Sequence, residues 1–355
     1  MPLLAARRPP GPPGDESSGD SASRAGRNGS PIALRRFAGP ARYVGELSHL
    51  RIAHLTDLHV GRVTPYEIQR HAVALANAQH PDLVVITGDF VCHSQLYLDQ
   101  LTALMREFKA PVIGVLGNHD YWAGAGEVRH ALQRGGVEML ANNHTTITLR
   151  HQKLQVVGLD DAYTGHARRD EAVKGLRSDL PTLGLSHIAE EADGLWRHNV
   201  PLVLAGHTHG GQVTFARLHE IALGRLAGHR YVHGLYGSRT APAPDPENPE
   251  HAGDGHGRGD GRPEAHRKGK PAGAVYVGAG IGAAVIPLRL GERGKREVTI
   301  FELGQAPGSF AEHHAEQVAL LGRKPSQAVT ERRAAAVVRK KDKRARKRTR
   351  EWDEA

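Results

Sequence analysis

The sequence lacks the features that define several common classes of protein. Its 355 residues include one cysteine, Cys92, which excludes an internal disulfide and a cysteine-rich metal site. No apolar run approaches the roughly 20 residues of a membrane-spanning helix, and the N-terminus does not have the pattern of a signal peptide. We therefore expect a cytoplasmic protein with no transmembrane segment.

Net charge is also scarce outside one segment of the chain. The whole sequence carries +9 at pH 7, but residues 323–355 alone hold 13 Lys or Arg against five Asp or Glu. The remaining residues are therefore close to neutral, and the basic character belongs to a C-terminal tail. Such a tail is able to contact an anionic membrane surface peripherally, or nucleic acid nonspecifically, through charge alone.

Composition divides the chain into three parts. Residues 1–35 are rich in Pro, Gly, Ser and Arg, and we predict that they are disordered. Residues 36–305 carry the strand and helix patterns of one domain. Within that domain, residues 241–272 hold six Pro, six Gly and no apolar residue larger than Ala, which predicts a disordered insertion. Residues 306–355 form a basic tail that we expect to be helical or disordered.

The order of apolar runs predicts an α/β fold. Residues 83–87 form an uninterrupted apolar run, typical of a buried parallel strand, and residues 51–56 and 111–116 are expected to be two further strands. Helical patterns at residues 65–78 and 96–108 separate them, and this alternation is typical of a parallel sheet. Shorter runs indicate a second sheet, which begins with strands at residues 138–140, 145–149 and 154–159. Further strands are expected at residues 183–185, 202–205, 274–277 and 297–303.

Five short polar motifs carry the chemistry, and each follows an apolar strand. They are Asp57-Leu58-His59, Gly88-Asp89, Gly117-Asn118-His119-Asp120, Ser186-His187 and Gly206-His207-Thr208-His209. Binding sites of open α/β sheets lie beyond the carboxyl ends of the strands, so the first three motifs should converge on one edge. The mixture of carboxylate, imidazole and amide groups suits Mn, Fe, Zn or Co. Its size fits two divalent ions, a pair that clamps the oxygens of a phosphoester displacement.

The residue types suggest how metal ions would be shared. Asp57 and His59 point the same way if strand geometry persists, so both can bind one ion. Asp89 is a natural bridging ligand because a carboxylate has two oxygens and can neutralise two adjacent cations. His207 and His209 lie two residues apart within a glycine-rich frame, and they can address one ion each.

The remaining motif residues have other expected roles. Asn118 offers an amide oxygen as a metal ligand, and His187 could supply one more imidazole. His119 faces differently from Asn118, so it is free to act as a general acid or to hold the phosphoryl oxygens. Asp120 could orient His119 by accepting a hydrogen bond from its other ring nitrogen.

In this order the motifs resemble the calcineurin-like metallophosphoesterase superfamily, over residues 50–305. The segments HLTDLH (54–59), GNHDYW (117–122) and GHTHGGQ (206–212) are most similar to its bacterial branch of YaeI/YkuE-type phosphodiesterases. The resemblance implies a four-layered α/β/β/α sandwich with a dinuclear metal site at the C-terminal ends of strands. It implies one ion held by Asp57, His59, Asp89 and His209, and a second held by Asp89, Asn118, His187 and His207. His119 would then assist catalysis.

We therefore expect a dinuclear metal-dependent hydrolase that attacks a phosphoester with a metal-bridging hydroxide. The resemblance favours a phosphodiester or pyrophosphate substrate, such as a lipid- or nucleotide-linked one. A phosphomonoesterase or a nuclease on the same fold is an alternative, and a non-catalytic scaffold with a vestigial site is another. Substrate specificity should lie in loops around residues 121–122, 160–166 and 215–236, whose residue types name no ligand.

Overall fold

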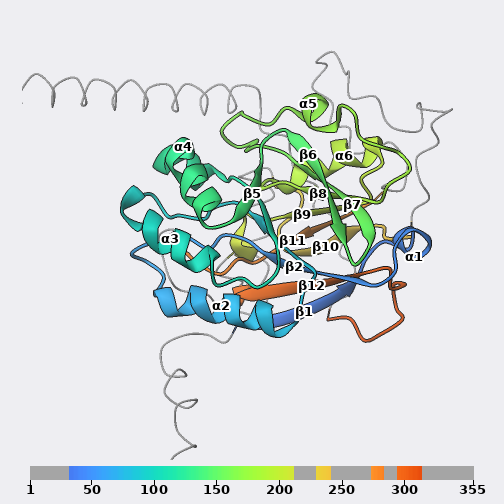
Figure 1. Ribbon diagram of the computed structural model, residues 1–355, viewed down its shortest axis with the longest axis horizontal. Helices are drawn as coiled ribbons and strands as arrows, with labels where there is room; N and C mark the ends of the chain where they lie inside the picture. The colour runs from blue at the N-terminus through green and yellow to red at the C-terminus, as the bar shows by residue number, and fades with distance from the viewer. Residues whose placement is uncertain (1–31, 212–228, 241–272, 284–293, 314–355) are drawn as a thin grey trace, which may run out of the picture. The chain divides into compact units, whose positions relative to one another are not determined.

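The computed structural model describes residues 32–211, 229–240, 273–283 and 294–313, all within the unit that begins at Ile32. These residues form two sheets, each with six strands (Figure 1). The first sheet has the order β1 (Ala33–Ala38), β12 (Glu297–Leu303), β2 (Leu50–Leu55), β3 (Leu83–Thr87), β4 (Val112–Val115) and β5 (Val137–Leu140). Its strands β2 to β5 run parallel, and β12 pairs antiparallel with β2.

The second sheet faces the first. It has the order β10 (Gly234–Gly237), β11 (Ala274–Val277), β9 (Leu202–Ala205), β8 (Thr182–Leu185), β7 (Gln152–Gly158) and β6 (Asn143–Leu149). Strands β7, β8, β9 and β11 are parallel, whereas β6 and β10 pair antiparallel at the two edges. Strands β8 and β9 are buried along their whole length, as expected for parallel strands covered on both faces.

Helices cover the outer face of each sheet. The first sheet carries α2 (Tyr66–Ala78), α3 (Leu98–Met105) and α4 (Asn118–Arg134), and the second carries the short helices α5 (Arg169–Val173) and α6 (Ala192–Leu195) (Figure 1). The short helix α1 (Tyr43–Glu46) joins β1 to β2. Single 3₁₀ turns, η1 (Gln95–Tyr97), η2 (Ala189–Glu191), η3 (Trp196–His198) and η4 (His209–Gly211), complete the described elements. No helix among the described residues has the length and apolarity to cross a membrane.

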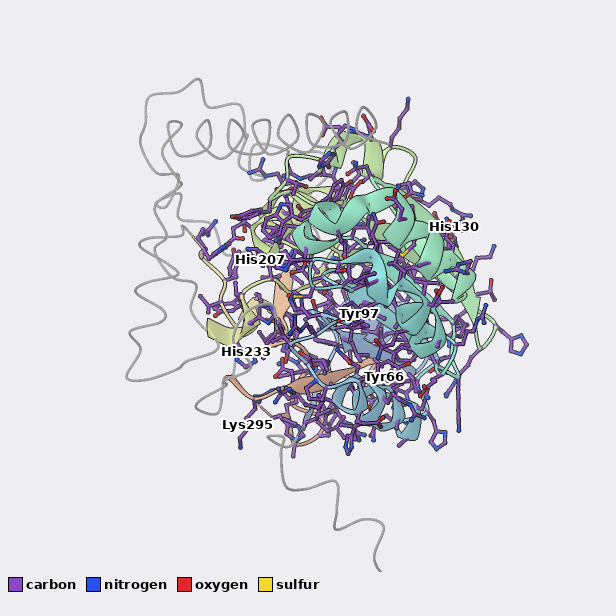
Figure 2. The ribbon with its side chains drawn as sticks, turned by 90° about the vertical axis from the view of Figure 1, so that its left-hand side faces the viewer. Tyr66, Tyr97, His130, His207, His233 and Lys295 are labelled. Carbon is purple, nitrogen blue, oxygen red and sulfur yellow. The ribbon has the colours of Figure 1, made fainter. Side chains whose placement is uncertain are left out.

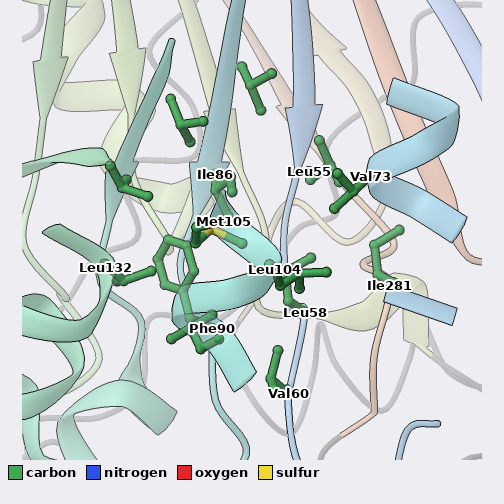
Figure 3. Close-up of a cluster of buried hydrophobic side chains, with 14 of the residues drawn as sticks. Leu55, Leu58, Val60, Val73, Ile86, Phe90, Leu104, Met105, Leu132 and Ile281 are labelled. Carbon is green, nitrogen blue, oxygen red and sulfur yellow. The ribbon is translucent and has the colours of Figure 1, made fainter. Parts of the chain in front are cut away.

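Three apolar clusters separate the four layers. The first lies between α2, α3, α4 and the first sheet, where Leu55 and Ile86 meet Val73 and Leu104 (Figure 3). The second fills the space between the two sheets, and the third lies between the second sheet and α5 and α6. Each fully buried large aliphatic side chain contributes about 1.5–3 kcal/mol. This arrangement confirms the predicted four-layered α/β/β/α sandwich.

Two expectations about strands need correction. The strand expected at residues 138–140 is β5, which lies at the edge of the first sheet rather than in the second. It follows α4, and a strand that follows a crossover helix rejoins the same parallel sheet. Strand β1 begins at Ala33 and pairs with β12. Regular structure therefore starts before residue 36, where the domain was expected to begin. Residues 1–31, 241–272 and 314–355 lie outside the described residues, as do the disorder predictions made for them.

Candidate metal centre

Parallel strands deliver the predicted ligands to one region. Strands β2, β3 and β4 are neighbours, and their carboxyl ends lead directly to Asp57, Asp89 and Asn118. In the facing sheet, the parallel strands β8 and β9 lead to His187 and His207. The site therefore forms where the carboxyl ends of both sheets meet, and within the first sheet Asp57, Asp89 and Asn118 converge on one edge as expected.

The ligand atoms gather in two groups that share one carboxylate. Asp57, His59, Asp89 and His209 each offer an atom within 4.8 Å of the others, and Asp89, His187 and His207 form a second such group. The side-chain oxygen of Asn118 lies 3.2 Å from Nε2 of His187, which places it at the second group. The structure thus brings together all seven residues for which metal binding is expected.

Distances within the groups fit shared cations. Nε2 of His59 lies 3.0 Å from Nε2 of His209, and Oδ2 of Asp89 lies 3.4 Å from Nε2 of His187. Oδ1 of Asp57 is buried and has no hydrogen-bond donor among the described residues, an arrangement that is costly unless another positive partner is present. Oxygen and imidazole donors in this number suit divalent transition metal ions.

The backbone at the site adopts an uncommon conformation. Left-handed φ angles, between 44° and 76°, occur at five of the candidate ligands, namely Asp57, His59, Asp89, His207 and His209. Each such residue costs on the order of 1–3 kcal/mol and persists only where the surroundings impose it. Strain of this kind gathers at functional sites, so its concentration here supports a functional role for the group.

Two glycines of the motifs are required by close approach. Gly88 has a φ of 88°, and a Cβ atom there would lie 2.6 Å from Nδ1 of His187. A Cβ at Gly206 would overlap Oγ1 of Thr56, whose hydroxyl donates to Asp57. Larger residues at these positions would displace a ligand or its hydrogen-bond partner.

Backbone carbonyls fix the orientation of two histidines. Nδ1 of His187 lies 2.7 Å from the carbonyl oxygen of Thr87, and Nδ1 of His119 lies 2.7 Å from that of Cys92. A carbonyl only accepts, so each Nδ1 carries the hydrogen and donates. Nε2 of His187 is left to face Asp89, and Nε2 of His119 lies 4.0 Å from Oδ2 of Asp89. His119 therefore presents Nε2 to the edge of the metal centre.

Asp120 does not orient His119, contrary to expectation. Its carboxylate accepts from the backbone N–H of Val91 at 3.1 Å and of Gly117 at 2.9 Å. Asp120 is the third residue of α4, where an acidic side chain commonly reaches back to the N-cap residue. The spacing from Gly117 to Asp120 is therefore a capping signal, and the carboxylate braces the loops that carry Asp89 and Asn118.

Charge within the site is distributed unevenly. Burial raises the pKa of Asp57 to about 7, and the nearby charge of Asp89 adds to this effect. Burial also acts to raise the pKa of Asp89, but His187 and neighbouring imidazoles outweigh it and hold that pKa well below its usual range. Burial acts to lower the pKa of His187, yet the carboxylates, Asp89 first, raise it to about 10. A metal ion would therefore bind in competition with protons.

Sequence reasoning named loops around the site but missed two histidines beside it. His93 lies in the loop after β3, and its ring centroid is 4.3 Å from that of His119. His229 precedes β10, and its ring lies 5.2 Å from that of His207. Lone histidines in loops carry no spacing pattern, so only the fold reveals their position.

Comparisons with known proteins agree with this geometry. The family model for calcineurin-like phosphoesterase matches residues 50–211. The chain is 30% identical over 193 residues to phosphodiesterase YaeI of Escherichia coli (strain K12), covering 52% of this chain and 69% of that protein. It is 26% identical over 259 residues to the uncharacterized metallophosphoesterase YkuE of Bacillus subtilis (strain 168), covering 71% and 78% respectively.

Among solved structures, the protein TT1561 of Thermus thermophilus is 18% identical, with a TM-score of 0.37 over 45% of this chain and 83% of that one. The matched family model, the similar relatives and the candidate metal ligands gathered at one site establish the family of this chain. The chain belongs to the calcineurin-like phosphoesterase family and is a metal-dependent hydrolase of phosphoester bonds.

Proposed function

We propose that this protein is a phosphodiesterase with two divalent metal ions, drawn from Mn, Fe, Zn or Co. The observation that carries the proposal is the position of Asp89, whose carboxylate belongs to both groups of candidate ligands. The name of the E. coli relative supports a diester substrate. The first ion would be held by Asp57, His59, Asp89 and His209, and the second by Asp89, Asn118, His187 and His207.

The chain's own residues would position and protonate the substrate. When bound, the ions supply a water of lowered pKa and positive charge for the phosphoryl oxygens. The Cys92 carbonyl holds Nδ1 of His119, so Nε2 is the atom that would hydrogen-bond a phosphoryl oxygen or give a proton to the leaving oxygen. Asp120 would act only indirectly, through the backbone of Gly117 and Val91.

Hydrolysis of bis-p-nitrophenyl phosphate and of p-nitrophenyl phosphate, with and without Mn²⁺, tests the proposal. We expect metal-dependent cleavage of the diester in preference to the monoester. The effect should be lost in Asp89→Ala and kept in Asp99→Ala, whose carboxylate is exposed and pairs with a surface arginine. Preference for the monoester, or diester cleavage that ignores added and removed metal, would overturn the proposal.

The natural substrate, the cellular location and the partners of the basic tail are further expectations. A lipid- or nucleotide-linked diester or pyrophosphate is the expected natural substrate, and the cytoplasm is the expected location. The basic tail at residues 306–355 is expected to meet anionic membranes or nucleic acid through charge alone. Such binding should weaken steeply as salt rises, and it should vanish when residues 323–355 are deleted.

A further inference from the structure

Aromatic rings form a continuous arc beside the metal centre. The rings of His93 and Trp122 are stacked, with centroids 5.8 Å apart and planes 10° apart. Trp122 meets Tyr163 at 6.1 Å, and Tyr163 meets the ligand His207 at 5.1 Å. His229 continues the series at 5.2 Å from His207. We call His93, Trp122, Tyr163 and His229 the aromatic arc.

The arc is assembled from four separate segments of the chain, and acidic side chains hold two of its members. The loop that carries Tyr163 is bound by the buried Asp161, which accepts from the backbone N–H of Tyr163 at 3.3 Å and of Thr164 at 2.7 Å. His229 lies with Nδ1 3.4 Å from a carboxylate oxygen of Glu190. These contacts hold the backbone at Tyr163 and the ring of His229, as expected for a preorganised binding surface.

Part of the arc is open to solvent. The side chain of Tyr163 is 36% exposed, which makes it one of the few exposed large hydrophobic residues in the described part of the chain. His93 is also exposed, and Trp122 is half-buried. Exposed rings beside a deep polar centre are typical of a binding surface, because their faces give up water readily while their edges stay wet.

Positioning of the catalytic groups does not account for the arc. His119 is already oriented by the carbonyl of Cys92, and the backbone N–H of His207 already donates to Asp57 at 3.1 Å. Trp122 packs beside His119, with ring centroids 4.6 Å apart, whereas the tautomer of His119 is set by the Cys92 carbonyl. A role in binding the substrate accounts for the presence of rings along the edge of the metal centre.

We propose that the aromatic arc binds a planar aromatic group carried by the substrate, so that the enzyme acts on phosphoesters that carry a nucleobase or another aromatic ring rather than on those whose groups are all aliphatic. The inference rests on the proposed hydrolysis at the metal centre and adds the class of substrate. Every nucleobase has a π-face, so stacking on aromatic side chains tolerates many bases. The phosphoryl group would reach the metal centre while the planar group lies against Trp122 and Tyr163.

Binding of two phosphates that differ only in the planar group tests the inference. Adenosine 5′-monophosphate and ribose 5-phosphate are titrated by calorimetry into the Mn²⁺-loaded full-length protein, and both are also used as inhibitors of bis-p-nitrophenyl phosphate cleavage. We expect the nucleotide to bind about tenfold tighter or more. Trp122→Ala and Tyr163→Ala should shrink this ratio toward one, whereas Tyr163→Phe should keep it.

Matched controls separate the possible outcomes. His93→Ala should lower the ratio, while His130→Ala should not, because His130 is exposed and lies well apart from His207 in Figure 2. Equal binding of both phosphates to the wild type, or octyl phosphate binding as tightly as the nucleotide, would overturn the inference. Equal weakening of both phosphates in Trp122→Ala would also overturn it and show a positioning role instead. Calorimetry decides the question even if the diester is not cleaved, a result that would count against the proposed function alone.

Discussion

Two buried polar clusters of this protein are built in opposite ways. In the first, the carboxylate of Glu297 receives the guanidinium of Arg35, Nε2 of His233 at 3.0 Å and the hydroxyl of Tyr276 at 2.8 Å. The backbone N–H of Ala279 adds a fourth contact at 2.9 Å. We call these residues the Glu297 cluster, and every charge in it meets an opposite charge or a donor.

The metal centre lacks this internal balance. Oδ1 of Asp57 has no donor among the described residues, and imidazole nitrogens of His59 and His209 face each other at 3.0 Å. Five of its residues have left-handed φ angles, whereas none of the left-handed residues in the described part belongs to the Glu297 cluster. The difference indicates that a buried cluster whose charges pair with one another serves stability, whereas one with a buried carboxylate oxygen that accepts no hydrogen bond among the described residues serves a ligand.

A short backbone segment connects the two clusters. Ala279 donates to Glu297, and three residues later the N–H of Gly282 donates to the carbonyl of Asp57 at 2.7 Å. The N–H of Ile281 similarly donates to the carbonyl of Thr56 at 3.2 Å. The balanced cluster thereby supports the strand end that carries the unbalanced one.

The largest effect is expected from Asp89→Ala. Both ions lose a ligand, so diester hydrolysis should fall by more than the roughly 10²–10⁴-fold expected from losing a general acid alone. Steady-state kinetics at saturating Mn²⁺ measures this loss, with Asp99→Ala as the unaffected control. If Asp89→Ala kept more than a small fraction of the activity, the metal centre would not depend on its shared carboxylate.

His119→Ala should have the next largest effect and should separate chemistry from metal binding. Its Nε2 faces the centre but belongs to neither group of candidate ligands, so bound metal should stay as in the wild type. We expect kcat to fall by about 10²–10⁴-fold. Metal analysis together with kinetics tests this, and loss of both metals in His119→Ala would contradict the division of roles.

Glu297→Gln should lower the stability of the fold, and it should leave the effect of added Mn²⁺ on thermal unfolding unchanged. Removing the charge of Glu297 breaks its buried ion pair with the guanidinium of Arg35, and breaking such a pair costs about 3–5 kcal/mol of unfolding free energy. Glu138→Gln, at an exposed position of β5, should change it by no more than about 0.5 kcal/mol. Thermal unfolding with and without Mn²⁺ measures both effects. An unchanged Tm in Glu297→Gln would mean that the cluster does not stabilise the fold.

The smallest expected effect is the pH dependence of the stability that Glu297 contributes to the fold. Burial acts to raise the pKa of Glu297, but His233 and Arg35 outweigh it and hold the pKa well below its ordinary value of 4.5. A carboxyl group of this kind stabilises the fold above its ordinary pKa, and the contribution is lost as pH falls toward its folded-state pKa. The stability difference between wild type and Glu297→Gln should therefore be smaller at about pH 3 than at about pH 7. Urea unfolding measures it, and an equal difference at both values would show that the charge of Glu297 is not what stabilises the cluster.

The metal centre could be predicted from the sequence because its ligands directly follow the ends of strands. Asp57, Asp89 and Asn118 follow neighbouring parallel strands, so a polar residue after an apolar run is enough to place each of them. The role of Asp120 was missed because helix capping and catalytic pairing use the same residue type. The placement of β5 was missed because strands of three or four residues carry no mark of the sheet they join.

The Glu297 cluster could not be found from the sequence. Arg35 and Glu297 are 262 residues apart, and they meet only because β1 and β12 pair. His233 and Tyr276 come from the other sheet, on strands or turns with no charge pattern. Contacts of this kind depend on long-range pairing, whereas motif spacing reports only what lies within one loop.

The number of metal ions bound per chain tests the proposed dinuclear centre most directly. Metal-free protein is dialysed against Mn²⁺, and bound metal is measured for the wild type, Asp89→Ala and Glu297→Gln. We predict two ions in the wild type and in folded Glu297→Gln, and a loss at both positions in Asp89→Ala. A wild type that binds no metal, or an Asp89→Ala variant that keeps both ions, would contradict a centre built around one shared carboxylate.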